Sequence, residues 1–189
     1  VHGRNVHPGS AKRCMINAQL IAMEFHGMLP VHDRPEATEG YEGFSHLCAM
    51  QGEVELATLE YIIRDHDRAS FEARKALFES AAAFLNAKYG AGTVGVALRD
   101  SYYNMREKIE PHMAIVEAAQ QAMRDAGVTP RVVPIRGGTD GARLSYEGLP
   151  CPNLFTGGEN YHGRFEYVPV EDMEAAVRTL KCILRNAAK

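Results

Sequence analysis

Four short segments carry side chains able to bind an anion or a metal ion. His7 stands before Pro8-Gly9 at a predicted strand-to-helix turn, and Arg64 ends a predicted strand among apolar neighbours. Residues 136–141 form a glycine-rich turn, and His162 lies in the loop 157–163. A neutral imidazole can hold zinc, and a guanidinium can clasp a carboxylate through two hydrogen bonds. Each segment also has an ordinary explanation, as an exposed turn histidine, a surface arginine or a structural turn.

Three consecutive residues, Asp65, His66 and Asp67, have side chains able to bind a metal ion. Neighbours on a strand point to opposite faces, so at most Asp65 and Asp67 could share an ion. A solvated strand end is the favoured interpretation of this run.

The secondary-structure elements that must position these residues follow one order in the first hundred residues and a different order in the rest. The expected order in the first hundred residues is an opening strand, a helix from Ser10 to Gly27, strands near 44–54 and 56–65, a helix from Ser70 to Gly90, and a strand from Val94. The buried stripe expected on the second helix is Phe71, Leu77, Phe78, Ala81, Phe84 and Leu85. The order strand, helix, strand, strand, helix, strand predicts a ferredoxin-like domain of α+β type.

The remaining residues alternate helix and strand, which predicts part of an α/β domain. A helix ends at Gly127, short apolar strands are expected at 131–135 and 153–156, and a last amphipathic helix carries Met173, Val177 and Leu180. Two short strands are too few for an independent sheet. We therefore expect the other strands to come from outside this sequence.

Composition narrows the class of protein further. The 189 residues are 46% hydrophobic and carry a net charge of −3 without a basic stripe, so nucleic acid is not an expected partner. No apolar run is long enough for a membrane span. The four cysteines form no CxxC pair, which favours reduced thiols in the cytoplasm. The sequence opens without Met and within a predicted strand, so we expect an upstream part.

Six segments, in this order, resemble the peptidase T family, the tripeptide aminopeptidases among the two-zinc exopeptidases. They are residues 5–9, 32–40, 61–65, 136–143, 152–158 and 162–163. The resemblance covers the whole chain. It implies a ferredoxin-like lid and dimerisation domain at 1–104 and the C-terminal part of a catalytic zinc-peptidase domain at 105–189.

The resemblance also implies roles for single residues. His162 would be a zinc ligand, His7 would reach the catalytic site and help to stabilise the oxyanion, and Arg64 and Arg136 would bind the C-terminal carboxylate of the substrate. Further residues expected near the cleft are Asn104, Thr139 and Asp140. Two zinc ions are expected in the complete enzyme. Most zinc ligands and the general-base glutamate belong to a family segment that this chain lacks, so the chain alone is expected to be inactive.

The prediction is therefore a zinc aminopeptidase that releases the N-terminal residue of tripeptides. Two alternatives remain at this point. One is a related zinc exopeptidase, a carboxypeptidase or an N-acyl-amino-acid hydrolase, against which the segment 32–40 argues. The other is a non-catalytic protein that forms a homodimer through the edge of the lid sheet.

Overall fold

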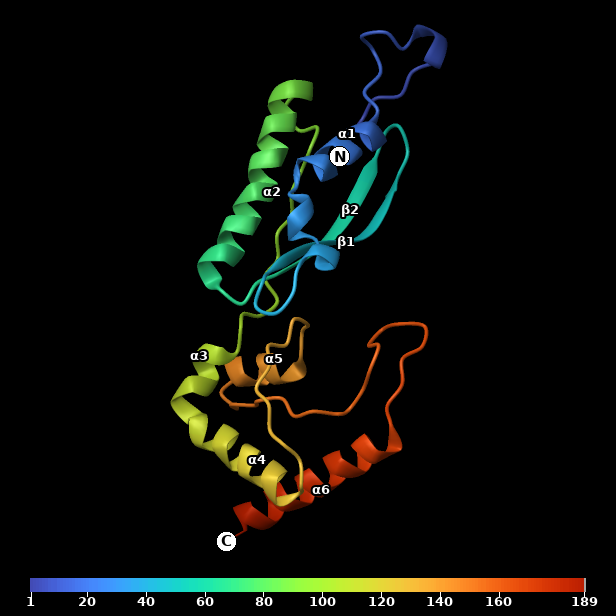
Figure 1. Ribbon diagram of the computed structural model, residues 1–189. Coiled ribbons are helices and arrows are strands. Elements are labelled where there is room, and N and C mark those ends of the chain that lie inside the picture. The colour runs from blue at the N-terminus through green and yellow to red at the C-terminus, as the bar shows by residue number, and fades with distance from the viewer. Residues whose placement is uncertain (189) are drawn as a thin grey trace. The chain divides into compact units, whose positions relative to one another are not determined.

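The computed structural model describes residues 1–188, which divide into two compact units (Figure 1). Unit 1 spans Val1–Ser101 and unit 2 begins at Tyr102. Each unit is a mixture of helix and extended chain. The expected α/β class holds at this level, with one two-stranded antiparallel sheet in the described residues.

Unit 1 is built around the hairpin of β1 and β2, with α1 and α2 packed against it. Its elements are η1 (Pro8–Ser10), α1 (Ala18–Met28), η2 (Val31–Asp33), η3 (Pro35–Ala37), β1 (Phe44–Gly52), β2 (Ala57–Arg64) and α2 (Arg68–Tyr89). The strands pair antiparallel, and Phe44 lies opposite Arg64. A register shift between Leu47 and Ala49 marks a bulge in β1. Both strands were expected near these positions, and that prediction is confirmed.

The first helix begins later than expected. The sequence suggested Ser10 as its cap and Gly27 as its end, but Ser10 lies in η1 and α1 starts at Ala18. The side chain of Asn17 accepts hydrogen bonds from the backbone N–H groups of Gln19 and Leu20. A bridge between Arg4 and Ile16 closes a loop over the intervening residues, so the helix can start only after that bridge.

The second helix follows the prediction more closely. Asp67 caps α2 by accepting a hydrogen bond from the backbone N–H of Ser70, and Gly90 ends the helix with a φ of 112°. A residue with a side chain rarely adopts such a φ, so glycine suits this position. Gly90 therefore ends the helix at the predicted place, whereas the helix begins at Arg68, two residues before the predicted Ser70, because the carboxylate of Asp67 caps it.

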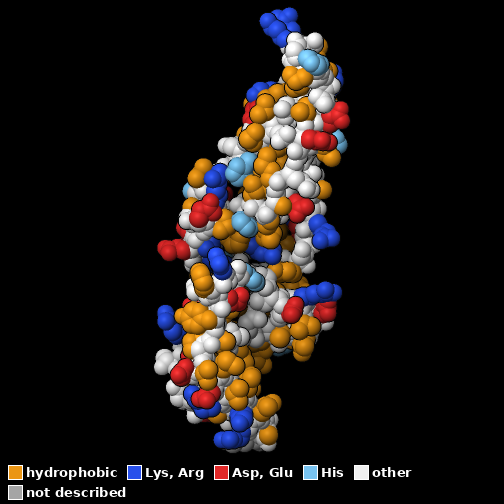
Figure 2. Space-filling model, turned by 90° about the vertical axis from the view of Figure 1, so that its right-hand side faces the viewer, with side chains coloured by type: hydrophobic (Ala, Val, Ile, Leu, Met, Phe, Trp, Pro, Cys, Tyr) orange, Lys and Arg blue, Asp and Glu red, His pale blue; other side chains and the backbone are white. Residues whose placement is uncertain are grey.

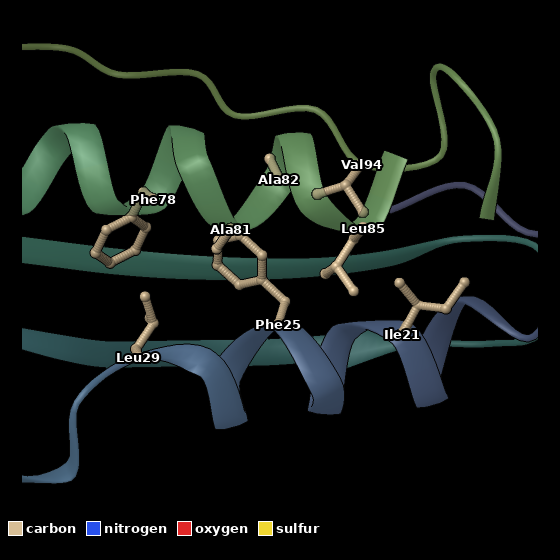
Figure 3. Packing of buried hydrophobic residues seen from close by; sticks show 8 residues of the cluster. All are labelled: Ile21, Phe25, Leu29, Phe78, Ala81, Ala82, Leu85 and Val94. Atoms are coloured by element: carbon tan, nitrogen blue, oxygen red, sulfur yellow. The ribbon is translucent and has the colours of Figure 1, made fainter. Parts of the chain in front are cut away.

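The core of unit 1 lies between α1, α2 and β2, as Figure 3 shows. Phe25 and Phe78 meet edge to face with ring centroids 5.8 Å apart, and Tyr61 of β2 packs on Phe78 at 4.9 Å. Leu85 is fully buried beside them. Phe84, predicted to be buried, is instead 56% exposed, because a rotation of 100° per residue turns it away from the face that carries Leu85.

The opening segment and the segment from Val94 are extended but do not form the two further strands that were expected. Val1 and Ala57 exchange two backbone hydrogen bonds, and His2 donates its N–H to the carbonyl of Thr93. The side chain of Asn86 occupies both backbone groups of Val94, at 2.8 and 2.9 Å. Pairing is therefore limited here to the bridge between His2 and Leu56 and to the single hydrogen bond from His2 to Thr93.

Unit 2 contains α3 (Arg106–Ile109), η4 (Glu110–His112), α4 (Met113–Asp125), α5 (Asp140–Tyr146) and α6 (Val170–Ala187). α4 packs against α6, and Asn186 donates a hydrogen bond to Asp125 near their ends. The strands expected at 131–135 and 153–156 are not formed within residues 1–188. A strand needs a neighbour to take up its backbone groups, and within unit 2 neither segment has one.

No helix within residues 1–188 is both long enough and apolar enough to cross a membrane.

Candidate functional site

His7 lies in the loop that the Arg4–Ile16 bridge closes, which stands away from the helices of unit 1 (Figure 1). The histidine is exposed, and its Nδ1 accepts a hydrogen bond from the N–H of Gly9 at 3.1 Å. Arg4 donates from Nε to the carbonyl of Cys14 and ties the two arms of the loop together. With Nδ1 engaged, Nε2 is the imidazole nitrogen presented outward for binding or proton transfer.

Arg64 is the last residue of β2, where the chain turns toward α2. Its neighbour Asp65 accepts a hydrogen bond from Nε of Arg74 at 2.9 Å, and Asp67 caps α2. The two carboxylates of the Asp65–Asp67 run are thus used by an ion pair and a helix cap. The run is neither a metal site nor a freely solvated strand end.

The turn before α5 carries three of the predicted site residues. Thr139 caps α5: its Oγ1 accepts from the N–H of Ala142 and from the side-chain amide of Asn153. Asp140 is the first residue of the helix and is exposed, and Arg136 lies in the turn and is half-buried. The predicted turn into a short helix therefore exists as a capped turn, although no strand precedes it, and Arg136 and Asp140 stand four residues apart in sequence.

Asn104 and His162 lie elsewhere in unit 2. Asn104 accepts from the N–H of Arg106 through its side chain and from the hydroxyl of Tyr146 through its carbonyl. His162 is exposed in a loop with a φ of 62°, and its N–H donates to the carboxylate of Glu166. The loop is closed by a bridge between Glu159 and Tyr167, which presents His162 at a tight turn.

No complete metal site is present in the described part of the chain. Residues 1–188 contain no group of three or more His, Cys, Asp or Glu side chains arranged to hold an ion. A catalytic zinc normally takes three protein ligands and a water. The residues described here do not fit a zinc ion by themselves.

A polar network in unit 1 was not foreseen. Nε and Nη1 of Arg74 in α2 contact the carboxylates of Asp65 and Asp33. Next to Asp33 in the sequence, Arg34 contacts His26 of α1, which in turn contacts Tyr61 of β2. Burial raises the pKa of Tyr61 to about 12, so its hydroxyl stays protonated. The density of charged residues in the predicted loop 29–43 was the available signal.

Comparison with known proteins decides the relationship. The chain is 55% identical over all 189 residues to peptidase T of Alkaliphilus oremlandii and 58% identical over 189 residues to peptidase T of Caldanaerobacter subterraneus subsp. tengcongensis. This chain is a homologue of peptidase T. The family described as the peptidase dimerisation domain matches residues 1–93.

Two solved structures share the fold. A tripeptidase from Staphylococcus aureus matches 100% of this chain and 50% of its own with a TM-score of 0.74 at 19% identity. The aminopeptidase PepT from Bacillus cereus matches 100% and 50% with a TM-score of 0.62 at 21% identity.

The match covers only part of these relatives. Against the two peptidase T sequences above, all of this chain aligns with 46% of their length. The chain thus spans about half the length of the curated relatives it matches.

Proposed function

We propose that this chain forms part of a zinc-dependent aminopeptidase that releases the N-terminal residue of tripeptides. The observation that carries the proposal is 55–58% identity to peptidase T, sustained over the whole chain. The relatives are about twice as long, so the activity belongs to a polypeptide that includes the remaining region. The 189 residues by themselves are expected to be inactive.

In this proposal residues 1–104 are the lid and residues 105–189 belong to the catalytic domain. The backbone bonds of unit 1 support a ferredoxin-like lid: the opening segment lies between the start of β2 and Thr93, and β2 pairs with β1. This is the neighbour order that a split βαβ sheet requires.

Side-chain roles follow from the same relationship. His162 would supply one zinc ligand and His7 would help to stabilise the oxyanion. Arg64 and Arg136 would read the C-terminal carboxylate of the tripeptide, because a guanidinium offers paired donors in the geometry of a carboxylate. Further candidates near the cleft are Asn104, Thr139 and Asp140.

Zinc enters this proposal only through the longer polypeptide. His162 alone cannot hold the ion, so the other ligands would come from the region of the relatives that this chain does not span. When bound, two zinc ions would polarise the scissile carbonyl and activate water.

Exposed apolar surface in unit 2 supports a missing neighbour. Val132 is 73% exposed and Val133 is 60% exposed, and α6 carries a further apolar row. That row is Met173, Val177, Leu180 and Leu184, all exposed. Hydrophobic side chains are plentiful in the part of Figure 2 that shows unit 2. Apolar surface of this kind usually marks a contact face, which we assign to the remaining region of the longer protein.

A region swap tests the function. The matching region of the Alkaliphilus oremlandii peptidase T is replaced by these 189 residues, and the chimera is assayed for zinc content and tripeptide hydrolysis. We expect the chimera to bind zinc and to cleave tripeptides. His162→Ala should lower kcat/KM by at least about a hundredfold, because replacing even a residue that only hydrogen-bonds to a metal ligand lowers metal affinity or activity by about 10–100-fold.

The matched control is His32→Ala, which removes another exposed histidine and should leave activity and zinc content unchanged. A folded chimera that keeps full activity without the His162 imidazole would sink the ligand assignment. A chimera that cleaves N-acylated amino acids but not tripeptides would favour the related zinc exopeptidases.

We further propose that the lid forms a homodimer through the outer edge of β1. Within residues 1–188, no second strand pairs with β1, and the strand contains no Lys, Arg, Asp or Glu. Natural edge strands usually carry such charges to block pairing. The match of residues 1–93 to a dimerisation domain supports a homodimer through this unit.

Charge placed on this edge tests the dimer. Ala49→Lys combined with Met50→Lys should convert a dimer into a monomer in analytical ultracentrifugation, because pairing would bring four cations together. The control adds two lysines at exposed apolar positions of α1, Leu20→Lys and Met23→Lys, and should leave the dimer intact. Equal dissociation by both variants would contradict the β1 interface.

A cytoplasmic location is part of the proposal. All four cysteines are free thiols, and Cys14 and Cys48 are exposed. Exposed thiols persist most readily in a reducing compartment.

A further inference from the structure

The segment Val31–Ala37, made of η2, Arg34 and η3, is attached to the rest of unit 1 by two polar links. In the first, Nη2 of Arg34 lies 3.1 Å from Nε2 of His26, and Nδ1 of His26 lies 2.9 Å from the hydroxyl of Tyr61. In the second, Arg74 joins Asp33 to Asp65. The links reach the segment from α1 and from α2, respectively.

The first link accepts only one protonation state of histidine. A guanidinium has donors and no acceptor, so Nε2 of His26 must accept from Arg34 through its lone pair. The proton of the neutral imidazole then lies on Nδ1 and is donated to the oxygen of Tyr61. A second proton on Nε2 would occupy the lone pair and set a positive imidazolium against a positive guanidinium.

The surroundings act in the same direction. Burial lowers the pKa of His26, Arg34 lowers it further, and Glu36 opposes them by raising it. Arg34 and Glu36 are the charged groups that act on the imidazole of His26. Tyr61, whose pKa is raised to about 12, faces the imidazole as a neutral hydroxyl. The Arg74 link joins a guanidinium to two carboxylates and does not involve His26.

We propose that His26 is an acid-sensitive latch for the segment Val31–Ala37, holding Arg34 when neutral and releasing it when protonated. The folded state favours the neutral form, so the latch is closed above the ordinary histidine pKa of 6.5 and opens as the pH falls through the lowered value. The Arg74 link remains, so the release is local and unit 1 stays folded.

An NMR titration of the 189-residue chain between pH 8 and 5 tests the latch. The His26 ring signals and the Arg34 guanidinium signals should move with one shared midpoint below 6.5. Between pH 7.5 and 5, the opening equilibrium of the Arg34 amide, corrected for intrinsic exchange, should rise roughly tenfold, the size expected for losing a hydrogen bond to a charged group.

Three variants make the test decisive. His26→Gln keeps a donor and an acceptor but cannot be protonated, so Arg34 should become insensitive to pH. In the control variant His32→Gln, which changes another histidine of the same segment, the His26 and Arg34 signals should titrate as in the unaltered chain. Arg34→Met removes the adjacent cation and should raise the His26 midpoint, a readout available even where the glutamine variant folds poorly. Arg34 signals that stay constant while His26 titrates, or that still titrate without His26, would overturn the proposal.

Discussion

Replacing Leu85 by alanine is expected to destabilise unit 1 by about 3 kcal/mol, the middle of the range for a leucine truncated in a close-packed core. Leu85 is 0% exposed and lies in the cluster of Figure 3 with Ile21, Phe25 and Phe78. Truncation removes the transfer free energy of the side chain and leaves a cavity. The rigid rings of Phe25 and Phe78, fixed edge to face, cannot collapse into it.

The neighbouring residue provides the control. Phe84→Ala removes a larger side chain from the same helix, but this ring is 56% exposed, so the free energy of unfolding should change by less than about 1 kcal/mol. Urea-dependent hydrogen exchange at the amides of α2 reports on unit 1 alone. Similar losses in the two variants would contradict the difference in burial between Leu85 and Phe84.

Arg74→Ala is the second substitution with a large expected effect, a loss of about 2–3 kcal/mol. The side chain of Asp65 is 5% exposed and that of Asp33 is 19% exposed, and Arg74 is the cation between them. Removing one partner of a fully buried ion pair costs about 3–5 kcal/mol, chiefly because a charge is left without compensation. Partial exposure of Asp33 places this case somewhat lower.

The geometry separates charge from shape in this network. Arg74→Lys keeps the positive charge but cannot contact both carboxylates from a planar fork, so it should recover only part of the loss. Arg178→Ala breaks an exposed ion pair with Glu174 at 3.9 Å and should cost less than about 1 kcal/mol. If Arg74→Ala proves as mild as Arg178→Ala, the Asp33–Arg74–Asp65 bridge contributes nothing to the fold.

The Arg74 prediction bears on the proposed site through Asp65, the neighbour of Arg64. Asp65 follows Arg64 directly, and Gly43, which begins the chain's return into β1, packs against Asp65. The bridge through Arg74 thus fixes the end of the strand that carries Arg64. If the position of Arg64 changes in the Arg74 variants, the loss of this anchoring explains the change, and no contact of Arg74 with substrate is needed.

Local patterns in the sequence were enough to predict those elements whose faces or ends depend on a few neighbouring residues. Alternation around Tyr61 and Ile63 predicted β2, and Gly90 predicted the end of α2 through its freedom at positive φ. Thr139 and the glycines around it predicted a turn into a short helix. The ordered motifs also indicated the relationship to peptidase T, which the identity over the whole chain confirms.

Tertiary structure alone decided where pairing stops and which polar groups meet. The strand expected from Val94 does not form, because Asn86, eight residues earlier on a helix, takes both backbone groups of Val94. The expected strands of unit 2 lack partners within the described chain, and Arg74 reaches Asp33 across a separation of 41 positions. Periodicity reports which face of an element is apolar, but hydrogen bonds and ion pairs depend on distances that only the folded chain sets.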